Sequence, residues 1–375
     1  MRSRSFSTYD WQSRLHSRWD IYNREPTASS NCRARSAPSL IICVYSITCA
    51  PVIAGFKILQ QNVASAALHN SAQRFDPPRC HPGTRIEIIQ SIFDWITHSE
   101  NRDHWLSWLN GAAGAGKSAI MQTIVERCIR EAIAMASFFF GRSDAGRNTM
   151  EHLVGTLAYQ LIGAIPDTTD TVLGTIENDP LIFRKSLEPQ LRQLIIQPLL
   201  DLPFTLRNPF VVFIDGLDEC LDRTHQSNLI KVLGNICSDK NIPIIFLIAS
   251  RREAQILSAF SADDIENLLE IVPLDESEAS DDIRQFLNDK FAMICQSHIH
   301  RKLLPSNWPP ISMVSEIVDK SSGQFIFASV VMNFVSSDRT NPADQLKIIR
   351  DLRLRDPSAE HPFAHLDSLY QYIFS

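Results

Sequence analysis

An eight-residue segment rich in glycine and alanine, at residues 111–118, constrains this chain more than any other feature. Its sequence, GAAGAGKS, matches the pattern GxxxxGK[ST] and follows the apolar run HWLSWLNG. Apolar residues with helical spacing continue after Lys117. Glycine-rich turns between a strand and a helix surround phosphate oxygens with backbone N–H groups. The sequence therefore predicts a phosphate-binding loop, formed by Gly111, Ala112, Ala113, Gly114, Ala115, Gly116, Lys117 and Ser118, with Ala119 following in the helix.

The polar end of this loop indicates which ligand it binds. In such loops the lysine reaches the β- and γ-phosphates, and the serine hydroxyl is a ligand of Mg²⁺. Lys117 and Ser118 occupy these two positions. We therefore expect ATP or GTP, together with Mg²⁺, as the cofactors of this chain.

Strands and helices alternate along the chain around the loop. Largely apolar runs are interleaved with segments of helical spacing, as in a parallel sheet covered on both faces. This pattern predicts an α/β fold, a P-loop NTPase with a parallel five-stranded sheet flanked by helices over 104–275. A small α-helical domain is expected at 276–375, a helical lead-in with the loop PRCHPGTR at 56–103, and a poorly ordered or atypical segment at 1–55. The predicted strands are 104–111, 134–141, 209–216, 242–251 and 265–274.

Three acidic residues follow the third predicted strand, in the sequence VVFIDGLDEC. Asp215 ends the apolar run, and parallel strands of such a sheet place their carboxyl ends at the edge where ligands bind. A carboxylate in this position holds Mg²⁺ beside the phosphates. We assign Asp215 and Ser118 to the metal, and either Asp218 or Glu219 to polarisation of the attacking water.

An arginine pair follows the fourth predicted strand, in the sequence IASRRE. Arg251 lies nearest the end of the strand, at the same edge of the sheet as Asp215. An arginine there can contact the γ-phosphate, and a solvated basic turn is the alternative interpretation. We therefore predict that Arg251 is a catalytic residue that contacts the γ-phosphate.

The composition sets broad limits on partners and location. Charged residues make up 21% of the chain and the net charge is −6, so no nucleic-acid partner is expected. The eight cysteines include no CxxC pair, which favours reduced thiols and a cytoplasmic location. The apolar run at 40–56 is shorter than the roughly 20 residues of a spanning helix. No membrane association is therefore expected, with a weak possibility at 40–56.

These motifs together resemble the NACHT domains of STAND-class signalling NTPases, and the fungal nephrocystin-3-like N-terminal domains in particular. The resemblance extends from about residue 56 to residue 374. It rests on segments that occur in the order the family shows: PRCHPGTR, WLNGAAGAGKSAI, ASFFFGRSDAGRNT, VVFIDGLDEC, SRREAQI, SSGQFIFAS and HLDSLYQYI.

The resemblance implies a molecular switch in fungal innate immunity, heterokaryon incompatibility or programmed cell death. Nucleotide exchange would then drive self-association, and hydrolysis would be weak at most. It further implies that PRCHPGTR packs on the nucleotide base, with Thr84 and Arg85 as base-side residues, although a structural clamp is the alternative. ATP is favoured because the NKxD element that selects guanine is absent, and GTP remains open.

Two departures from the family pattern leave other functions open. No repeat array follows the module, and the chain ends before or within the expected winged-helix domain. A non-catalytic, nucleotide-dependent interaction module or a gene fragment is therefore one alternative. A metabolic or AAA-type P-loop enzyme is another, because Arg142 and Arg147 after the second strand could act as lid arginines.

Overall fold

The computed structural model describes residues 54–74, 76–98, 102–274 and 279–351. The expectations for residues 1–53, including most of the apolar run at 40–56, lie outside the described residues. The same holds for the expected winged-helix boundary and for HLDSLYQYI, which belong to residues 352–375.

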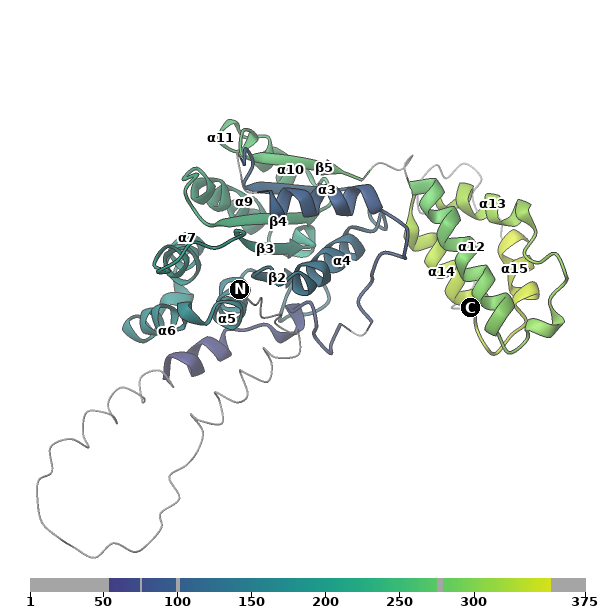
Figure 1. Cartoon of the computed structure of the whole chain (residues 1–375), viewed down its shortest axis with the longest axis horizontal. Helices are drawn as coiled ribbons and strands as arrows, with labels where there is room; N and C mark the ends of the chain where they lie inside the picture. The colour runs from purple at the N-terminus through teal and green to yellow at the C-terminus, as the bar shows by residue number, and fades with distance from the viewer. Residues whose placement is uncertain (1–53, 75, 99–101, 275–278, 352–375) are drawn as a thin grey trace, which may run out of the picture.

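A parallel five-stranded sheet forms the centre of the larger domain (Figure 1). Its strand order is β2-β3-β4-β1-β5, so β4 lies between the strand that precedes the P-loop and the strand that ends in Asp215. All four pairings are parallel, which confirms the predicted fold class. The strands are β1 (Leu106–Asn110), β2 (Met135–Phe139), β3 (Phe210–Asp215), β4 (Ile244–Ser250) and β5 (Leu269–Pro273).

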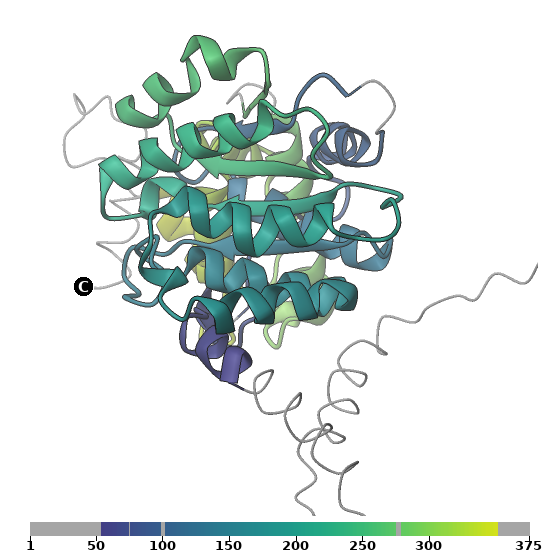
Figure 2. The same cartoon turned by 90° about the vertical axis from the view of Figure 1, so that its left-hand side faces the viewer.

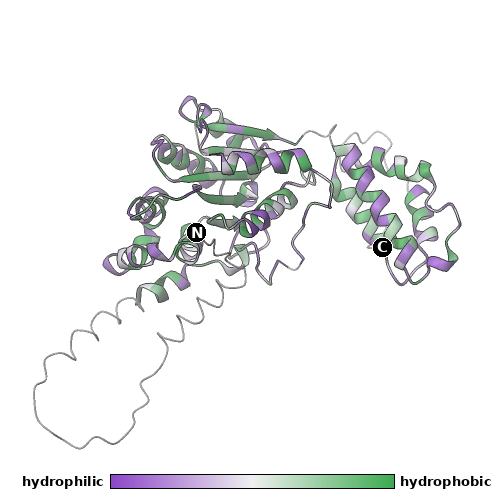
Figure 3. Ribbon diagram, viewed as in Figure 1, coloured by the Kyte–Doolittle hydropathy of each residue, from purple (hydrophilic) through white to green (hydrophobic). Residues whose placement is uncertain are grey.

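Burial explains why the sequence of these strands is so apolar. Every residue of β1, β2, β3 and β4 is buried, because helices cover both faces of the sheet (Figures 2 and 3). A strand buried on both faces needs a continuous apolar run rather than alternation. In the edge strand β5 only Leu269 is buried, and Ile271 is 55% exposed.

Helices connect the strands by crossovers, as parallel pairing requires. Helix α4 packs on β2, β3 and β4, whereas the ring of Phe260 in α10 stacks on Trp108 of β1 at 4.6 Å between centroids. The helices of this domain are α3 (Ile86–Thr97), α4 (Lys117–Arg130), α5 (Leu153–Ala164), α6 (Thr169–Asn178), α7 (Leu187–Leu191), α8 (Gln197–Leu200), α9 (Arg223–Cys237), α10 (Ala254–Phe260) and α11 (Asp263–Glu266).

A second domain, with four α-helices over the described residues 279–351, lies beside the sheet domain (Figure 1). It has its own hydrophobic core, in which the rings of Phe291 and Trp308 meet edge to face. These helices agree with the predicted helical domain. They are α12 (Ala279–Ser297), α13 (Ile311–Ser321), α14 (Phe325–Val335) and α15 (Pro342–Asp351).

The lead-in segment runs along the β2 edge of the sheet domain before it reaches α3. It begins with a helix at 54–61 and a 3₁₀ turn at Ser65–Ala67. Gly155 of α5 provides the close approach here, because a Cβ on this residue would lie 2.3 Å from the Asn62 carbonyl oxygen. The Ala64 N–H donates to Thr156 Oγ1 at 2.9 Å, which anchors the lead-in to α5.

The lead-in also joins the two domains. The backbone N–H of Arg85 donates to Asp282 Oδ2 of α12 at 3.0 Å, and His81 Nε2 lies 2.8 Å from Asp289 Oδ2 of the same helix. The loop PRCHPGTR therefore contacts the helical domain as well as the sheet domain.

Among the described residues, no helix is both long and apolar enough to cross a membrane.

Candidate nucleotide-binding site

The P-loop connects β1 to α4, and its backbone takes conformations that only glycine adopts easily. Gly114 has φ +76° and Gly116 has φ +99°, which side chains with a Cβ rarely adopt. Gly116 is the residue before the first turn of α4, so the loop leads directly into the N-terminus of that helix. This arrangement presents backbone N–H groups and the positive end of a helix to one site.

Lys117 is held by the loop itself. Its Nζ donates to the carbonyl oxygens of Gly111 at 2.9 Å and Ala112 at 2.8 Å. Burial lowers the pKa of this amine, while Asp218 and Asp215 nearby act in the opposite direction. The ammonium therefore lies across the loop, where hydrogen bonds to phosphate oxygens can replace those to the carbonyls.

Asp215 and Ser118 bring hard oxygen atoms together at the end of β3. Asp215 is 5% exposed, and its Oδ1 is buried with no hydrogen-bond partner. Burial raises the pKa of this carboxyl to about 6, although a hydrogen bond with Ser118 and the nearby Arg74 oppose the rise. A buried carboxylate oxygen without a partner, beside a serine hydroxyl, fits the oxygen ligands that Mg²⁺ prefers. Asp215 and Ser118 would therefore hold Mg²⁺.

The two other acidic residues of the motif have protein partners. Gly216, with φ +70°, turns the chain into the short 3₁₀ helix Leu217–Glu219. Asp218 Oδ1 accepts the backbone N–H of Arg251 at 3.0 Å, and its Oδ2 lies 3.1 Å from Arg251 Nε. Glu219 Oε2 accepts the backbone N–H of Arg142 at 3.1 Å. Both oxygens of Asp218 are thus used by one arginine, whereas the hydrogen bond described for Glu219 uses one oxygen.

The end of β4 lies between the P-loop strand and the Asp215 strand. In register, Ser250 pairs with Asn110 and Ala249 pairs with Asp215, so Arg251 emerges between the two motifs. Its side chain is 51% exposed and forms the ion pair with Asp218. The structure therefore brings together the three elements that the sequence predicted at this edge of the sheet.

Thr84 forms a hydrogen bond within the lead-in, and Arg85 contacts the P-loop. The Thr84 hydroxyl donates to the His81 carbonyl at 2.8 Å. Arg85 is 5% exposed, and its Nη2 donates to the Ala115 carbonyl of the P-loop at 3.3 Å. A role of either residue in binding the nucleotide base stays a prediction.

Sequence reasoning missed polar and apolar contacts made by residues far apart in the chain. Arg252, passed over in favour of Arg251, donates from Nε to Asn110 Oδ1 at 2.5 Å, just before the P-loop. The backbone N–H of Ile326 in α14 donates to the Gly114 carbonyl at 3.3 Å. A Cβ on Gly114 would lie 2.3 Å from Ile326 Cγ2, so the helical domain touches the loop closely. The glycine spacing of the P-loop gives no sign of this contact.

Comparison with known proteins gives a family match to the region of this site. Residues 84–251 match the family model described as "Nephrocystin 3, N-terminal". The matched stretch holds the P-loop, the VVFIDGLDEC motif and Arg251. Over this stretch the chain is similar to nephrocystin-like P-loop NTPases. A comparison with curated proteins finds no match.

The solved structures that match this chain have little sequence in common with it. One is PCH-2 of C. elegans, at 10% identity over 77% of this chain and 69% of that chain, with a TM-score of 0.38. Another is domain III of the Thermotoga maritima replication initiation protein DnaA, at 13% identity, 72% and 92% coverage, and a TM-score of 0.37. Drosophila ORC bound to GC-rich DNA and Cdc6 has 12% identity, 93% and 57% coverage, and a TM-score of 0.34.

Proposed function

We propose that this chain is a nucleotide-dependent signalling switch of the NACHT type, which binds ATP in preference to GTP and hydrolyses it slowly. The observation that carries the proposal is the meeting of the P-loop with Asp215, whose buried Oδ1 has no protein partner beside Ser118. Burying such an oxygen is unfavourable unless a ligand compensates it. Mg²⁺ with a nucleoside triphosphate provides that compensation.

The residues of the site have distinct roles in this proposal. The P-loop N–H groups and Lys117 bind the phosphates, and Ser118 and Asp215 hold Mg²⁺, which supplies positive charge to the phosphate oxygens. Glu219 is the better candidate to polarise water, because both oxygens of Asp218 are engaged by Arg251. Arg251 therefore links the acidic motif to the phosphate site.

The contacts of two arginines, Arg142 and Arg147, support slow hydrolysis by a switch rather than turnover by a metabolic enzyme. Arg142 and Arg147, considered as lid arginines of a metabolic enzyme, are tied to the sheet domain. Arg142 Nη2 donates to the Asp218 carbonyl at 3.3 Å, and Arg147 Nη1 donates to the Phe139 carbonyl at 3.2 Å. Hydrolysis would require rearrangement of these contacts, as expected of a switch. Self-association on nucleotide exchange and a cytoplasmic location belong to the same proposal.

Nucleotide binding by Lys117→Ala tests the function. We expect the unaltered protein to bind ATP and ADP in Mg²⁺ with a dissociation constant on the order of micromolar, and Lys117→Ala to abolish binding in titration calorimetry. Lys231→Ala, an exposed lysine of α9, is the matched control and should bind normally. Unchanged binding by Lys117→Ala overturns the proposal. ATP hydrolysis at about 10 s⁻¹, a typical turnover number of enzymes, would favour a metabolic enzyme instead.

Nucleotide-dependent assembly separates the switch from the non-catalytic alternative. Light scattering in ADP and in a slowly hydrolysed ATP analogue measures the mass of the particle. Association in the ATP analogue with measurable hydrolysis supports the switch, and association without hydrolysis supports an interaction module. A monomer in both nucleotides contradicts the self-association part of the proposal.

A further inference from the structure

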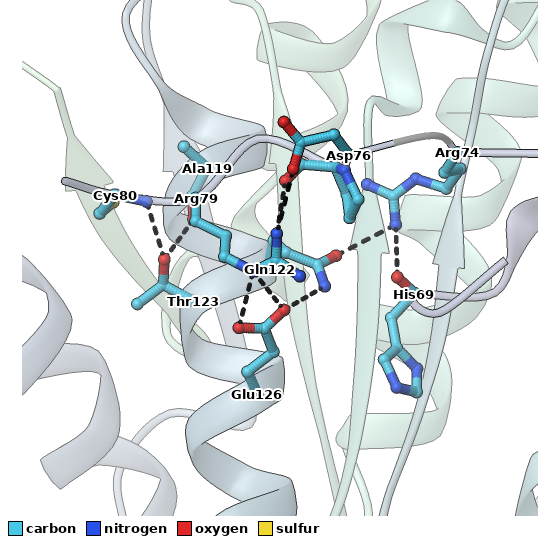
Figure 4. A network of polar contacts seen from close by, with 10 residues as sticks. His69, Arg74, Asp76, Arg79, Cys80, Ala119, Gln122, Thr123 and Glu126 are labelled. Atoms are coloured by element: carbon cyan, nitrogen blue, oxygen red, sulfur yellow. Dashed lines mark hydrogen bonds and ion pairs between the residues drawn. The ribbon is translucent and has the colours of Figure 1, made fainter. Parts of the chain in front are cut away.

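A segment that begins ahead of the family-matched stretch crosses α4 close to the candidate metal site. This segment, residues 69–74 and 76–85, is called the strap below. Arg79 Nε lies 2.8 Å from Glu126 Oε1, and the Cys80 N–H donates to Thr123 Oγ1 at 3.0 Å (Figure 4). The strap is therefore fixed to α4 at two residues that lie about one helical turn apart.

Arg74 is the residue of the strap that turns toward the carboxyl edge of the sheet. Its Cζ lies 3.6 Å from the centroid of the Phe139 ring, and its Nη1 donates to Gln122 Oε1 at 3.1 Å (Figure 4). The same Nη1 lies 3.4 Å from the His69 carbonyl. The guanidinium is thereby held between the last residue of β2 and the second turn of α4.

Both of these neighbours lead directly to the metal site. Phe139 is the register partner of Asp215, and register partners on parallel strands project to the same face of a sheet. Gln122 lies four residues after Ser118, which places both on one face of α4. Arg74 is thus flanked by the neighbours of the two residues that would hold Mg²⁺.

The guanidinium of Arg74 has further N–H donors that could bind a ligand. Across the described residues, its hydrogen bonds all leave from Nη1, and no carboxylate lies within ion-pair distance. The nearby Arg147 differs, because its Nε pairs with Asp144 Oδ2 at 3.1 Å. Burial lowers the pKa of Arg74 to about 10, and Asp215 opposes this effect, so Arg74 is a cation at neutral pH.

We propose that Arg74 binds the terminal phosphate of a bound nucleoside triphosphate from the side of the metal site, so that this site distinguishes triphosphate from diphosphate. Ser118 and Asp215 would hold Mg²⁺ next to the terminal phosphates, so a cation beside these two residues would face that end of the nucleotide rather than the base. A guanidinium presents a planar set of donors that matches phosphate oxygens. This inference rests on the proposed nucleotide binding.

The strap also connects this contact to the helical domain. It ends at Arg85, whose backbone N–H donates to Asp282 of α12. A phosphate bound by Arg74 therefore acts on the same segment that holds the helical domain. The signal for the terminal phosphate would reach α12 through the strap, which leads from Arg74 to Arg85.

Affinities for two nucleotides test the inference without relying on hydrolysis. Dissociation constants for Mg²⁺ with a non-hydrolysable ATP analogue and with ADP are measured by calorimetry for Arg74→Met, Arg74→Lys and, as the matched control, Arg130→Ala, an exposed arginine at the end of α4. Arg74→Met keeps an unbranched side chain over Phe139, so packing is largely retained. We expect it to weaken analogue binding about 10- to 100-fold, as for a lost charge-assisted contact, and ADP binding less than about threefold. Arg74→Lys should restore part of the preference, and Arg130→Ala should keep all of it.

The outcomes separate this inference from the proposed function. An equal loss for both nucleotides in Arg74→Met, with a lowered melting temperature, assigns Arg74 a structural role and overturns the inference. Unchanged affinities overturn it as well. Failure of the proposed function is distinct, because then the unaltered protein binds neither nucleotide and Lys117→Ala has no effect.

Discussion

The sheet domain and the helical domain differ in how they are held together and in how they meet. Each has its own hydrophobic core, and the cores form separate clusters. Across the junction, by contrast, polar contacts connect the lead-in to α12, including Arg85 with Asp282 and His81 with Asp289. The exposed pair of His81 with Asp289 can exchange with water at little net cost, whereas buried cores cannot. The comparison indicates two stable units with an adjustable junction, located at the P-loop.

The largest effect on stability is expected when a large core side chain is truncated in each domain separately. Phe213 of β3 is 0% exposed and Phe291 of α12 is 1% exposed. Each change to alanine should lower the free energy of unfolding by about 3–5 kcal/mol, because of lost burial and the cavity left behind. Hydrogen exchange measured by mass spectrometry should rise across the sheet in Phe213→Ala, but only across α12–α15 in Phe291→Ala. Equal exchange in both domains for either variant would show one cooperative unit and break the comparison.

The next effect concerns the site inside the sheet domain. The raised pKa of Asp215, from 3.8 to about 6, means that the folded state holds the proton more tightly than the unfolded state. This contribution to stability is complete below about pH 4 and is lost as the pH rises to about 6. The difference of roughly two between the folded and unfolded pKa values corresponds to about 3 kcal/mol of unfolding free energy.

Asp215→Asn should therefore stabilise the protein by up to about 3 kcal/mol at pH 7.5, in urea denaturation with a chelator and without nucleotide. The gain should shrink toward zero near pH 4, where the carboxyl of the unaltered protein is protonated. The same variant should lose Mg²⁺-dependent nucleotide affinity. A pH-independent gain would contradict the assignment of the effect to this carboxyl.

The smallest effect should come from the junction. Asp282→Ala removes the acceptor of the Arg85 N–H, and we expect the docking of α12 to weaken by about 1–3 kcal/mol because a buried donor loses its partner. The weaker docking should appear as faster hydrogen exchange at 84–86 and in the first turns of α12. Asp289→Ala is the matched control. Asp289 is 51% exposed, so its pair with His81 should contribute less than about 1 kcal/mol. Equal effects of the two variants would remove the distinction between buried and exposed junction contacts.

Local patterns were sufficient to predict most of the fold. The five apolar runs all became parallel strands, because burial on both faces leaves a continuous apolar signature in each strand. The P-loop was equally predictable, since Gly114 and Gly116 provide the positive φ angles that its turns require. The strand order, with β4 inserted between β1 and β3, left no such trace in the sequence.

The site was predicted only in part. The placement of Asp215 and Arg251 at one edge followed from their positions at strand ends. The partners of Asp218 and Glu219 did not, because a carboxylate in a turn has the same sequence signature whether it is free or paired. Arg74 was missed for a related reason: a single arginine in an irregular segment carries no periodicity.

The sequence by itself determined the strands, the helices of both domains and the conformation of the phosphate loop, because each depends on residues close together in the chain. Only the tertiary structure decided that Arg74 lies beside the candidate metal site, that Asp282 holds the lead-in and that Ile326 covers Gly114. These contacts join residues up to about 200 positions apart. Their geometry depends on how the two domains and the strap pack together, and no short-range pattern encodes that packing.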